Sequence, residues 1–97
     1  MPRLIFSQDS ITDLQRLYEF LATKNAAASD RARQKILADL KALPHFPEAH
    51  RPVQGMAHQR ELVIKFGSYG YIARYHYERG ADVVVLRIWH QREDISG

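Results

Sequence analysis

"RELVIKFGSYGYIARYHYERGADVVVLRIWH", residues 60–90, decides the fold class of this chain. Apolar and polar residues alternate at its start, as they do along a half-buried strand. Glycine-containing turns follow at residues 67–70 and 79–81, and two further strand-like runs occupy residues 71–78 and 82–90. Short turns between such runs join antiparallel neighbours. The stretch therefore predicts a three-strand antiparallel meander.

Two helical segments precede this meander. The first follows a short apolar run at residues 3–6 and a polar cluster in which Ser7 or Ser10 is the candidate N-cap. The second follows a break at residues 25–29, with Ser29 as its candidate N-cap. One face of each helix is marked by apolar residues at spacings of three and four: Ile11, Leu14, Leu17 and Leu21 with Tyr18 beside them, then Ala32, Ile36, Leu40 and Leu43. The pattern predicts an N-terminal strand followed by a helical hairpin.

Proline residues separate the hairpin from the meander. Pro44 ends the second helix, and with Pro47 and Pro52 nearby we expect residues 44–58 to form a packed loop. The elements together predict an α+β fold, in which the helical hairpin packs on one face of an antiparallel sheet that ends in the meander. A chain of 97 residues leaves little room for a second hydrophobic core, so we expect a single domain, residues 1–97.

Strict alternation along the strands assigns side chains to the two faces of the sheet. The face that the helices cover is expected to carry Leu62, Ile64, Phe66, Ala73, Tyr75, Tyr77, Val84, Leu86 and Ile88. The opposite, open face is expected to carry Lys65, Arg74, His76, Arg87 and Trp89. This second set makes the open face basic and aromatic.

Two explanations fit such a face. Antiparallel sheets often leave one side wetted, where long cations cover apolar neighbours such as Ile72, Val83 and Val85. A binding surface is the other explanation. Trp89 lies beside Arg87 in the strand, and large aromatic side chains next to cations are typical of interface anchors and base-stacking platforms. This pairing favours a binding role.

Composition narrows the class of protein. The hydrophobic share of 45% and the charged share of 26% are those of a globular protein. Cysteine is absent, which excludes disulfides and thiolate metal sites. No segment has the length of a membrane span or the pattern of a secretion signal, so we expect a cytoplasmic protein. The formal charge of +3 favours acidic partners such as nucleic acid or an acidic protein.

Histidines and glycines of the chain raise two further possibilities. His45, His50 and His58 lie in the proline-rich loop, but without cysteine or a close carboxylate cluster they do not predict a metal site, and we expect no cofactor. Gly67 and Gly70 have the spacing of an RNA-binding clamp loop, which a helix should follow, whereas here a strand follows. A module that only binds nucleic acid stays open as one interpretation, supported by the charge and by Trp89.

Nearly the whole chain, and most specifically residues 60–94, resembles the toxins of the RelE/ParE superfamily, from bacterial type II toxin–antitoxin systems. The resemblance rests on an Arg-Glu-Leu strand, a Gly-x-x-Gly turn, an aromatic middle strand and the ending "IWHQRED", residues 88–94. The order of strand, helical hairpin and three strands is also similar. It implies a small cytoplasmic protein that inhibits growth and is silenced by a cognate antitoxin.

The superfamily contains two activities. The RelE-like branch consists of ribosome-dependent mRNA endoribonucleases, and cleavage of RNA needs cations for the charged transition state and groups that transfer protons. In this chain Arg74, Arg87 and Lys65 are the candidate cations, and Glu61 and His76 are the candidate proton-transfer groups. If this branch applies, the protein is an enzyme acting on the ribosome and its mRNA.

The ParE-like branch inhibits DNA gyrase by protein–protein contact and needs no catalytic residues. RelE-like toxins commonly carry a tyrosine near the C-terminus, whereas residues 94–97 here are Asp-Ile-Ser-Gly, so we favour the ParE-like branch. The resemblance then implies that gyrase is the target, that an antitoxin is the second partner and that the protein is not an enzyme. The target-binding residues expected are Arg74, Arg87, Trp89, His90 and Arg92.

Overall fold

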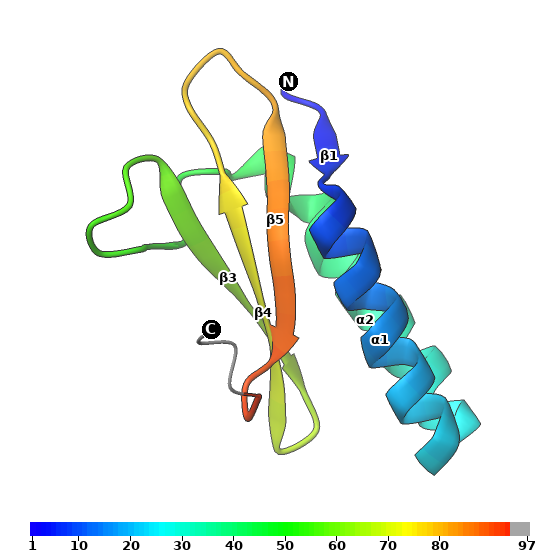
Figure 1. Cartoon of the computed structure of the whole chain (residues 1–97). Coiled ribbons are helices and arrows are strands. Elements are labelled where there is room, and N and C mark those ends of the chain that lie inside the picture. Colours follow the sequence, from blue (N-terminus) through cyan, green and yellow to red (C-terminus); the bar gives the residue numbers. More distant parts are fainter. Residues whose placement is uncertain (94–97) are drawn as a thin grey trace.

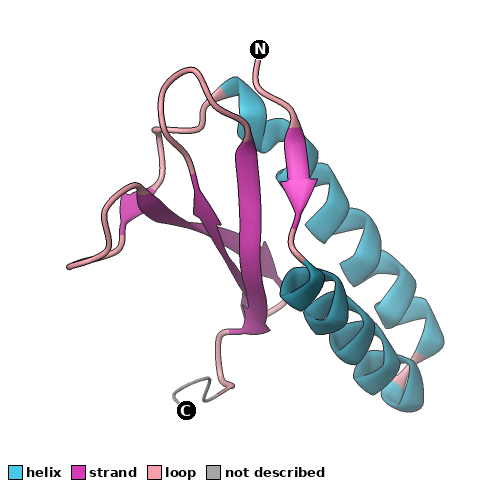
Figure 2. Cartoon of the chain, turned by 45° about the horizontal axis from the view of Figure 1, so that its top comes forward, coloured by secondary structure: helices cyan, strands magenta, loops and turns pink. Residues whose placement is uncertain are grey.

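The computed structural model describes residues 1–93, whose strands form one five-stranded sheet with two helices along one side (Figure 1 and Figure 2). The sheet order is β1-β5-β4-β3-β2. The strands are β1 (Leu4–Phe6), β2 (Arg51–Pro52), β3 (Gln59–Phe66), β4 (Tyr69–His76) and β5 (Val83–His90). The helices are α1 (Gln8–Lys24), α2 (Ala26–Ala42) and the short 3-10 helix η1 (Leu43–His45). The predicted α+β fold with a helical hairpin and a terminal meander is confirmed.

The sheet is mixed, because β1 pairs with β5 in parallel while the other neighbours are antiparallel. β1 lies beside the last strand, β5, although the helical hairpin and three other strands separate the two along the chain (Figure 1). The proline-rich loop also differs from the expectation. Its residues Arg51 and Pro52 pair with Glu61 and Arg60 to add β2 at the opposite edge. An edge strand tolerates proline, which lacks an N–H to donate.

The two helices meet at a single residue that caps both. The backbone N–H of Asn25 donates to Leu21 at the end of α1, and its side chain accepts the N–H of Ala28 at 3.1 Å to start α2. The expected cap at Ser29 is therefore wrong. Ser29 lies inside α2, where its buried hydroxyl donates to the carbonyl of Tyr18 at 3.1 Å and ties the helices together. Ser7 caps α1 by accepting the N–H of Ser10, as one of the two expected alternatives.

The core lies between the hairpin and the sheet. Leu17 of α1 and Ile36 and Leu40 of α2 are buried, and Leu14 packs against them partly buried. The sheet contributes the buried side chains of Leu62, Ile64, Tyr71, Ala73, Tyr75, Val83, Val85 and Ile88. Burying apolar surface of this kind stabilises a domain by about 25 cal/mol per Å². Ile11, expected on the same helical face, is exposed at the start of α1.

A β-bulge in β5 changes which side chains face the helices. Arg74 pairs with Arg87, whereas the next residue, Tyr75, pairs with Val85, so one extra residue, Leu86, is inserted in β5. The insertion reverses the alternation on one side of the bulge. Val83 and Val85 are consequently fully buried with Ile88, in place of the expected Val84 and Leu86. Strict period-two counting is correct only after the bulge.

The β3–β4 hairpin turns through Gly67 and Ser68, so β4 begins earlier than expected, at Tyr69. Gly67 has φ of +63°, which favours glycine. Gly70 is needed for a different reason. A Cβ added there would lie 2.1 Å from the backbone oxygen of Ile64, so a side chain would collide with β3. The two glycines of the motif thus serve the hairpin itself.

Within residues 1–93, none of the helices has the length and apolar character needed to cross a membrane.

Candidate functional site

The open face of the sheet carries an ion-pair network centred on Glu61. Arg74 donates to Glu61 Oε2 from Nε at 3.1 Å and from Nη2 at 2.7 Å, and Arg51 donates to Oε1 at 3.2 Å. Residues 61 and 74 are partners across β3 and β4, so the register of the hairpin places the two charges opposite each other. Both oxygens of the candidate base Glu61 are therefore already occupied by guanidinium groups.

Trp89 lies behind this network. The guanidinium carbon of Arg74 is 5.3 Å from the centre of its ring, a cation–π contact, and only 6% of the residue is exposed. The expectation of an exposed aromatic platform at Trp89 is wrong, because the residue is buried. One of its contacts is with Arg74, which was itself expected to bind the target.

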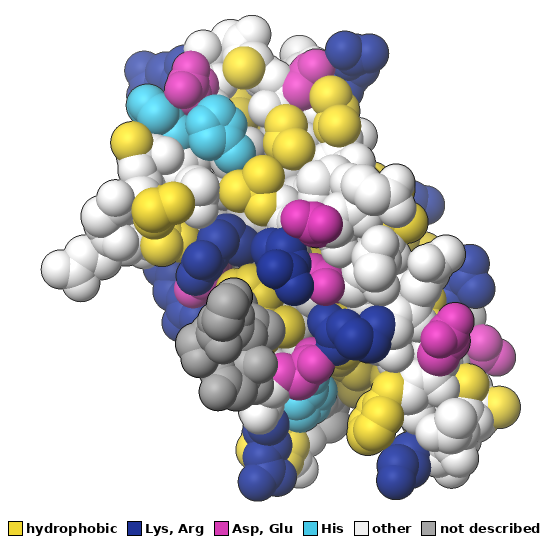
Figure 3. All heavy atoms as spheres, viewed as in Figure 1, with side chains coloured by type: hydrophobic (Ala, Val, Ile, Leu, Met, Phe, Trp, Pro, Cys, Tyr) yellow, Lys and Arg dark blue, Asp and Glu magenta, His cyan; other side chains and the backbone are white. Residues whose placement is uncertain are grey.

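Arg87, the partner of Arg74 across the sheet, is turned toward α1. Its Nε donates to Asp13 Oδ2 at 2.8 Å and its Nη2 to Asp13 Oδ1 at 3.2 Å. Asp13 also accepts the backbone N–H of Ile88 at 2.8 Å, and Arg16 reaches its Oδ1 at 3.3 Å. Burial would raise the pKa of Asp13, but these hydrogen bonds from Arg87, Ile88 and Arg16 outweigh it and lower the pKa. Figure 3 shows dark blue cations beside magenta carboxylates across this part of the molecule.

The other candidate nuclease residues lie apart from each other. Lys65 is exposed near the β3–β4 turn, toward one end of the sheet. His76 is at the opposite end of β4, where its Nε2 lies 3.6 Å from Glu78 and its ring is 5.9 Å from that of His58. The structure thus places Arg74 and Arg87 side by side, but it does not bring Lys65 and His76 together with them.

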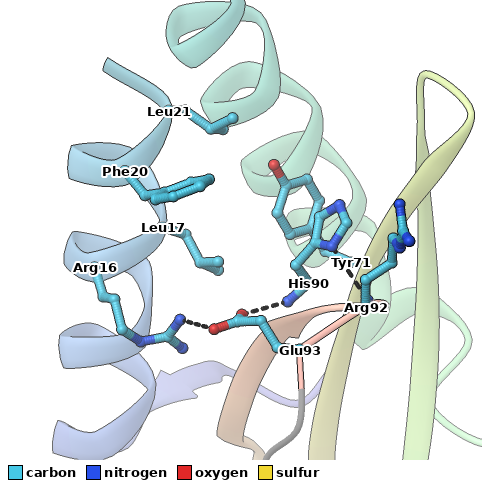
Figure 4. A pocket seen from close by; sticks show the side chains of 8 residues that line it. All are labelled: Arg16, Leu17, Phe20, Leu21, Tyr71, His90, Arg92 and Glu93. Atoms are coloured by element: carbon cyan, nitrogen blue, oxygen red, sulfur yellow. Dashed lines mark hydrogen bonds and ion pairs between the residues drawn. The ribbon is translucent and has the colours of Figure 1, made fainter. Parts of the chain in front are cut away.

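A pocket opens on the helix side of the sheet, between α1, the start of β4 and the end of β5 (Figure 4). Its volume is about 540 Å³. It is lined by Arg16, Leu17, Phe20 and Leu21 of α1, Tyr71 of β4, His90 of β5 and the following residues Arg92 and Glu93. We call it the α1 pocket. Two of the expected target-binding residues, His90 and Arg92, therefore lie here and not beside Trp89, because alternation puts residues 89 and 90 on opposite faces.

Hydrogen bonds fix the mouth of the α1 pocket. Glu93 accepts the backbone N–H of His90 at 2.8 Å with one oxygen and pairs with Arg16 through the other. The backbone N–H of Arg92 donates to His90 Nδ1 at 3.1 Å. The guanidinium of Arg92 lies over the Tyr69 ring, 4.8 Å from the ring centre. The His90 ring stands edge-on to Tyr71. Figure 4 shows Arg16, Glu93 and His90 linked in series across the opening.

Tyr71 supplies the pocket with a neutral polar group. Its side chain is 2% exposed. Burial raises the pKa of Tyr71, and the nearby carboxylate of Glu93 raises it further. The phenol therefore stays protonated at neutral pH, and the floor of the pocket carries no charge.

Both the ion pairs of the open face and the α1 pocket include residues that the sequence analysis did not identify. Asp13, Arg16, Phe20 and Glu93 are the most important of them. A signal for Asp13 was present, since it precedes Leu17 by four residues and so shares the buried face of α1. Nothing in the sequence indicated that Arg16 and Glu93 meet, because they are far apart along the chain.

The histidines of the proline-rich loop are possible metal ligands by residue type alone. His50 packs edge-on against Tyr75, and burial lowers the pKa of His50. Among residues 1–93, no group of three or more histidine and carboxylate side chains is arranged to hold a metal ion.

The structure is thus a two-helix hairpin on one face of a small mixed sheet, with an apolar pocket at one end. Residues 4–95 match the family described as the ParE toxin of the type II toxin–antitoxin system, parDE, and the chain belongs to this family. It is thus a toxin of a type II toxin–antitoxin system, in which an antitoxin is the partner.

The chain is also similar to a curated protein and to a solved structure. The chain is 37% identical over 82 residues to Toxin RelE3 of Caulobacter vibrioides, covering 84% of this chain and 85% of that protein. A solved structure of the chromosomal ParDE toxin–antitoxin system from P. aeruginosa has the same fold, with a TM-score of 0.77, 18% identity and coverage of 93% of this chain and 96% of that chain.

Proposed function

We propose that this toxin inhibits DNA gyrase by protein–protein contact and does not cleave RNA. The observation that supports the proposal is the pairing of both central cations with carboxylates, Arg74 with Glu61 and Arg87 with Asp13. A nuclease needs cations directed at the charge that develops on the phosphate. Here each guanidinium is directed at a carboxylate of the protein itself, so the open face offers little uncompensated positive charge at its centre.

The proton-transfer groups of a nuclease also fit poorly. Both Glu61 oxygens accept hydrogen bonds from arginines, and His76 lies at the far end of β4 beside Glu78. General acid–base catalysis requires two groups within hydrogen-bond reach of the reacting atoms. A protein-binding inhibitor has no such requirement. The absence of a catalytic role is therefore part of the proposal.

We place the gyrase contact at the end of the sheet that carries Tyr69 and Arg92. Tyr69 is half exposed and Arg92, stacked on it, is exposed. A rigid aromatic ring with a pre-ordered guanidinium is the composition of a binding hot spot. Of the other residues expected to bind the target, His90 supports this surface, because its Nδ1 accepts the backbone N–H of Arg92. Arg74, Arg87 and Trp89 lie on the opposite face of the sheet and are not part of it. The toxin acts in the cytoplasm, where its target is located.

A ribosome-dependent mRNA endoribonuclease is the second candidate. The name of the Caulobacter relative, Toxin RelE3, favours it, and Lys65 and His76 remain as its candidate groups. Binding of nucleic acid without toxicity is less well supported, because the buried ring of Trp89 offers no platform for stacking bases.

Purified protein decides between these activities. We expect it to inhibit supercoiling by gyrase and to leave mRNA on programmed ribosomes intact. Arg92→Glu is expected to weaken inhibition by about tenfold or more, as for a hot-spot residue. Arg31→Glu reverses an exposed charge on α2 and serves as the matched control, with inhibition unchanged. Site-specific transcript cleavage that Arg87→Ala abolishes, with supercoiling unaffected, would reject gyrase as the target.

A further inference from the structure

We propose that the α1 pocket binds a segment of the antitoxin in which an apolar side chain is followed closely by a carboxylate. The inference rests on the toxin's belonging to a toxin–antitoxin system and assigns the antitoxin to a particular site. It does not depend on whether gyrase or the ribosome is the target.

The walls of the α1 pocket select an apolar side chain. Leu17, Phe20 and Leu21 line it from one turn of α1, and Tyr71 closes its floor with a neutral ring. Phe20 is 61% exposed although it stands at the entrance of an apolar cavity. A volume of about 540 Å³ is within the range of pockets that enclose drug-sized groups, so one large side chain and its adjoining backbone fit. An apolar pocket of this size with a few polar groups at its mouth is typical of a binding site.

The mouth of the pocket selects a carboxylate. One is already held there, since Glu93 receives the N–H of His90 and the guanidinium of Arg16. This contact shows that the donors at the mouth are arranged for a carboxylate. Arg92 adds a third donor group beside them, exposed and oriented by its stacking on Tyr69. An acidic residue of the partner therefore pairs with Arg92, or replaces Glu93 on Arg16.

His90 adds a hydrogen-bond donor at the mouth of the pocket. Its Nδ1 accepts the N–H of Arg92, so in the neutral ring the proton is on Nε2. Nε2 is then a donor, which matches an acceptor on the partner, such as a carboxylate or a backbone carbonyl. Among residues 1–93, the mouth of the pocket is lined by the donors Arg16, Arg92 and His90 and by one carboxylate, Glu93.

The character of the two surfaces favours the antitoxin over the toxin's target as the occupant. Interfaces that persist are more apolar than transient ones. The α1 pocket is the apolar surface, and an antitoxin that silences the toxin must remain bound. Because Arg92 borders both the pocket and the proposed target surface, an antitoxin seated here would also cover the residue that meets the target.

Phe20→Glu tests the assignment against a matched variant. Phe46→Glu changes a phenylalanine that is similarly exposed, 69%, but does not line the pocket. Both proteins are purified from their complexes with the cognate antitoxin and refolded, and antitoxin binding is measured by calorimetry. Phe20→Glu is expected to weaken binding by about thirtyfold or more, as at an interface hot spot, and Phe46→Glu by less than about threefold. Both are expected to inhibit growth when expressed without antitoxin.

The outcomes separate this inference from the proposed target. Wild-type affinity of Phe20→Glu for the antitoxin overturns the pocket assignment, while inhibition of supercoiling by the same protein leaves the gyrase proposal intact. Loss of supercoiling inhibition with unchanged antitoxin binding also overturns the pocket assignment and indicates that the pocket binds gyrase. If Phe20→Glu does not refold, Arg92→Glu provides the same measurement at the mouth of the pocket, with an expected loss of about tenfold and with Arg31→Glu as its control.

Discussion

The carboxylate of Asp13 on α1 holds the guanidinium of Arg87 on β5 by two hydrogen bonds and at the same time accepts the backbone N–H of Ile88. β1 pairs with β5 only as far as Val85, and Ser7 then binds the carbonyl of Leu86. Asp13 thus extends the row of hydrogen bonds that β1 and Ser7 make to the edge of β5. A helix side chain replaces a strand as the partner of the sheet edge.

Replacing this carboxylate is expected to loosen α1 from the sheet. Asp13→Asn keeps the size of the side chain and a carbonyl for Ile88 but removes the charge that Arg87 requires. The side chain of Asp13 is buried and that of Arg87 is 46% exposed, so solvent screens part of the pair, and we expect a loss of about 1–3 kcal/mol in the free energy of unfolding. Urea titration measures it. Asp39→Asn, which removes the exposed pair with Lys35 on α2, is the control and should change stability by less than about 0.5 kcal/mol.

The same carboxylate is expected to give the domain an acid-sensitive stability. The pKa of Asp13 is lower in the folded protein, so its contribution is fully present above the unfolded pKa, about 3.9, and is lost as pH falls through the folded value. Thermal melts between pH 6 and pH 2 should show wild type losing more stability below about pH 4 than Asp13→Asn does. Parallel pH profiles of the two proteins would contradict this role.

Leu17 is expected to be indispensable for folding. It is 5% exposed at the centre of the contact between α1 and the sheet. Leu17→Asp buries an unpaired carboxylate, which costs several kcal/mol, comparable to the whole stability of a small domain. Circular dichroism should show no cooperative melt. Ile11→Asp, at a 40% exposed position of the same helix, should melt cooperatively and close to wild type.

The two glycines of the β3–β4 hairpin are expected to differ in their tolerance of alanine. At Gly67 an added Cβ meets nothing within 4 Å, and the positive φ alone makes Gly67→Ala less stable by about 1–2 kcal/mol. At Gly70 the Cβ would lie 2.1 Å from the Ile64 oxygen, and β3 and β4 must separate to admit it. We expect Gly70→Ala to lose about 3 kcal/mol or more, or to remain unfolded. Equal melting temperatures for the two variants would argue against the close approach.

Tyr75 is expected to limit stability at high pH. Its hydroxyl donates to the Pro47 carbonyl at 2.6 Å, and burial raises the pKa of Tyr75 to about 12. Since the folded pKa exceeds the unfolded value of about 10, its contribution is complete below pH 10 and is lost as pH rises toward the folded value. Tyr75→Phe should cost about 1 kcal/mol at pH 7 and show a shallower decline above pH 10 in urea titrations.

The sequence by itself was sufficient for the fold class and the superfamily, but not for the parallel pairing of β1 or for the edge strand β2. Spacings of three and four residues identified both helices, and alternation identified the hairpin strands, because these periods follow from local backbone geometry. Leu17, Ile36 and Leu40 were correctly assigned to the core for that reason. The motifs in residues 60–94 were sufficient for the superfamily.

Tertiary structure alone decided the site. The bulge at Leu86 reversed the faces of Val83 to Val85, and no local pattern marks a single inserted residue. Arg87 looked like a free cation until α1 placed Asp13 against it, and Trp89 looked like an exposed platform although its ring is buried. The α1 pocket joins residues of α1 to residues at and after the end of β5, and Arg16 and Glu93, which pair at its mouth, are 77 positions apart. Local periodicity shows which way a side chain points along its own element, whereas its partners depend on how distant elements pack.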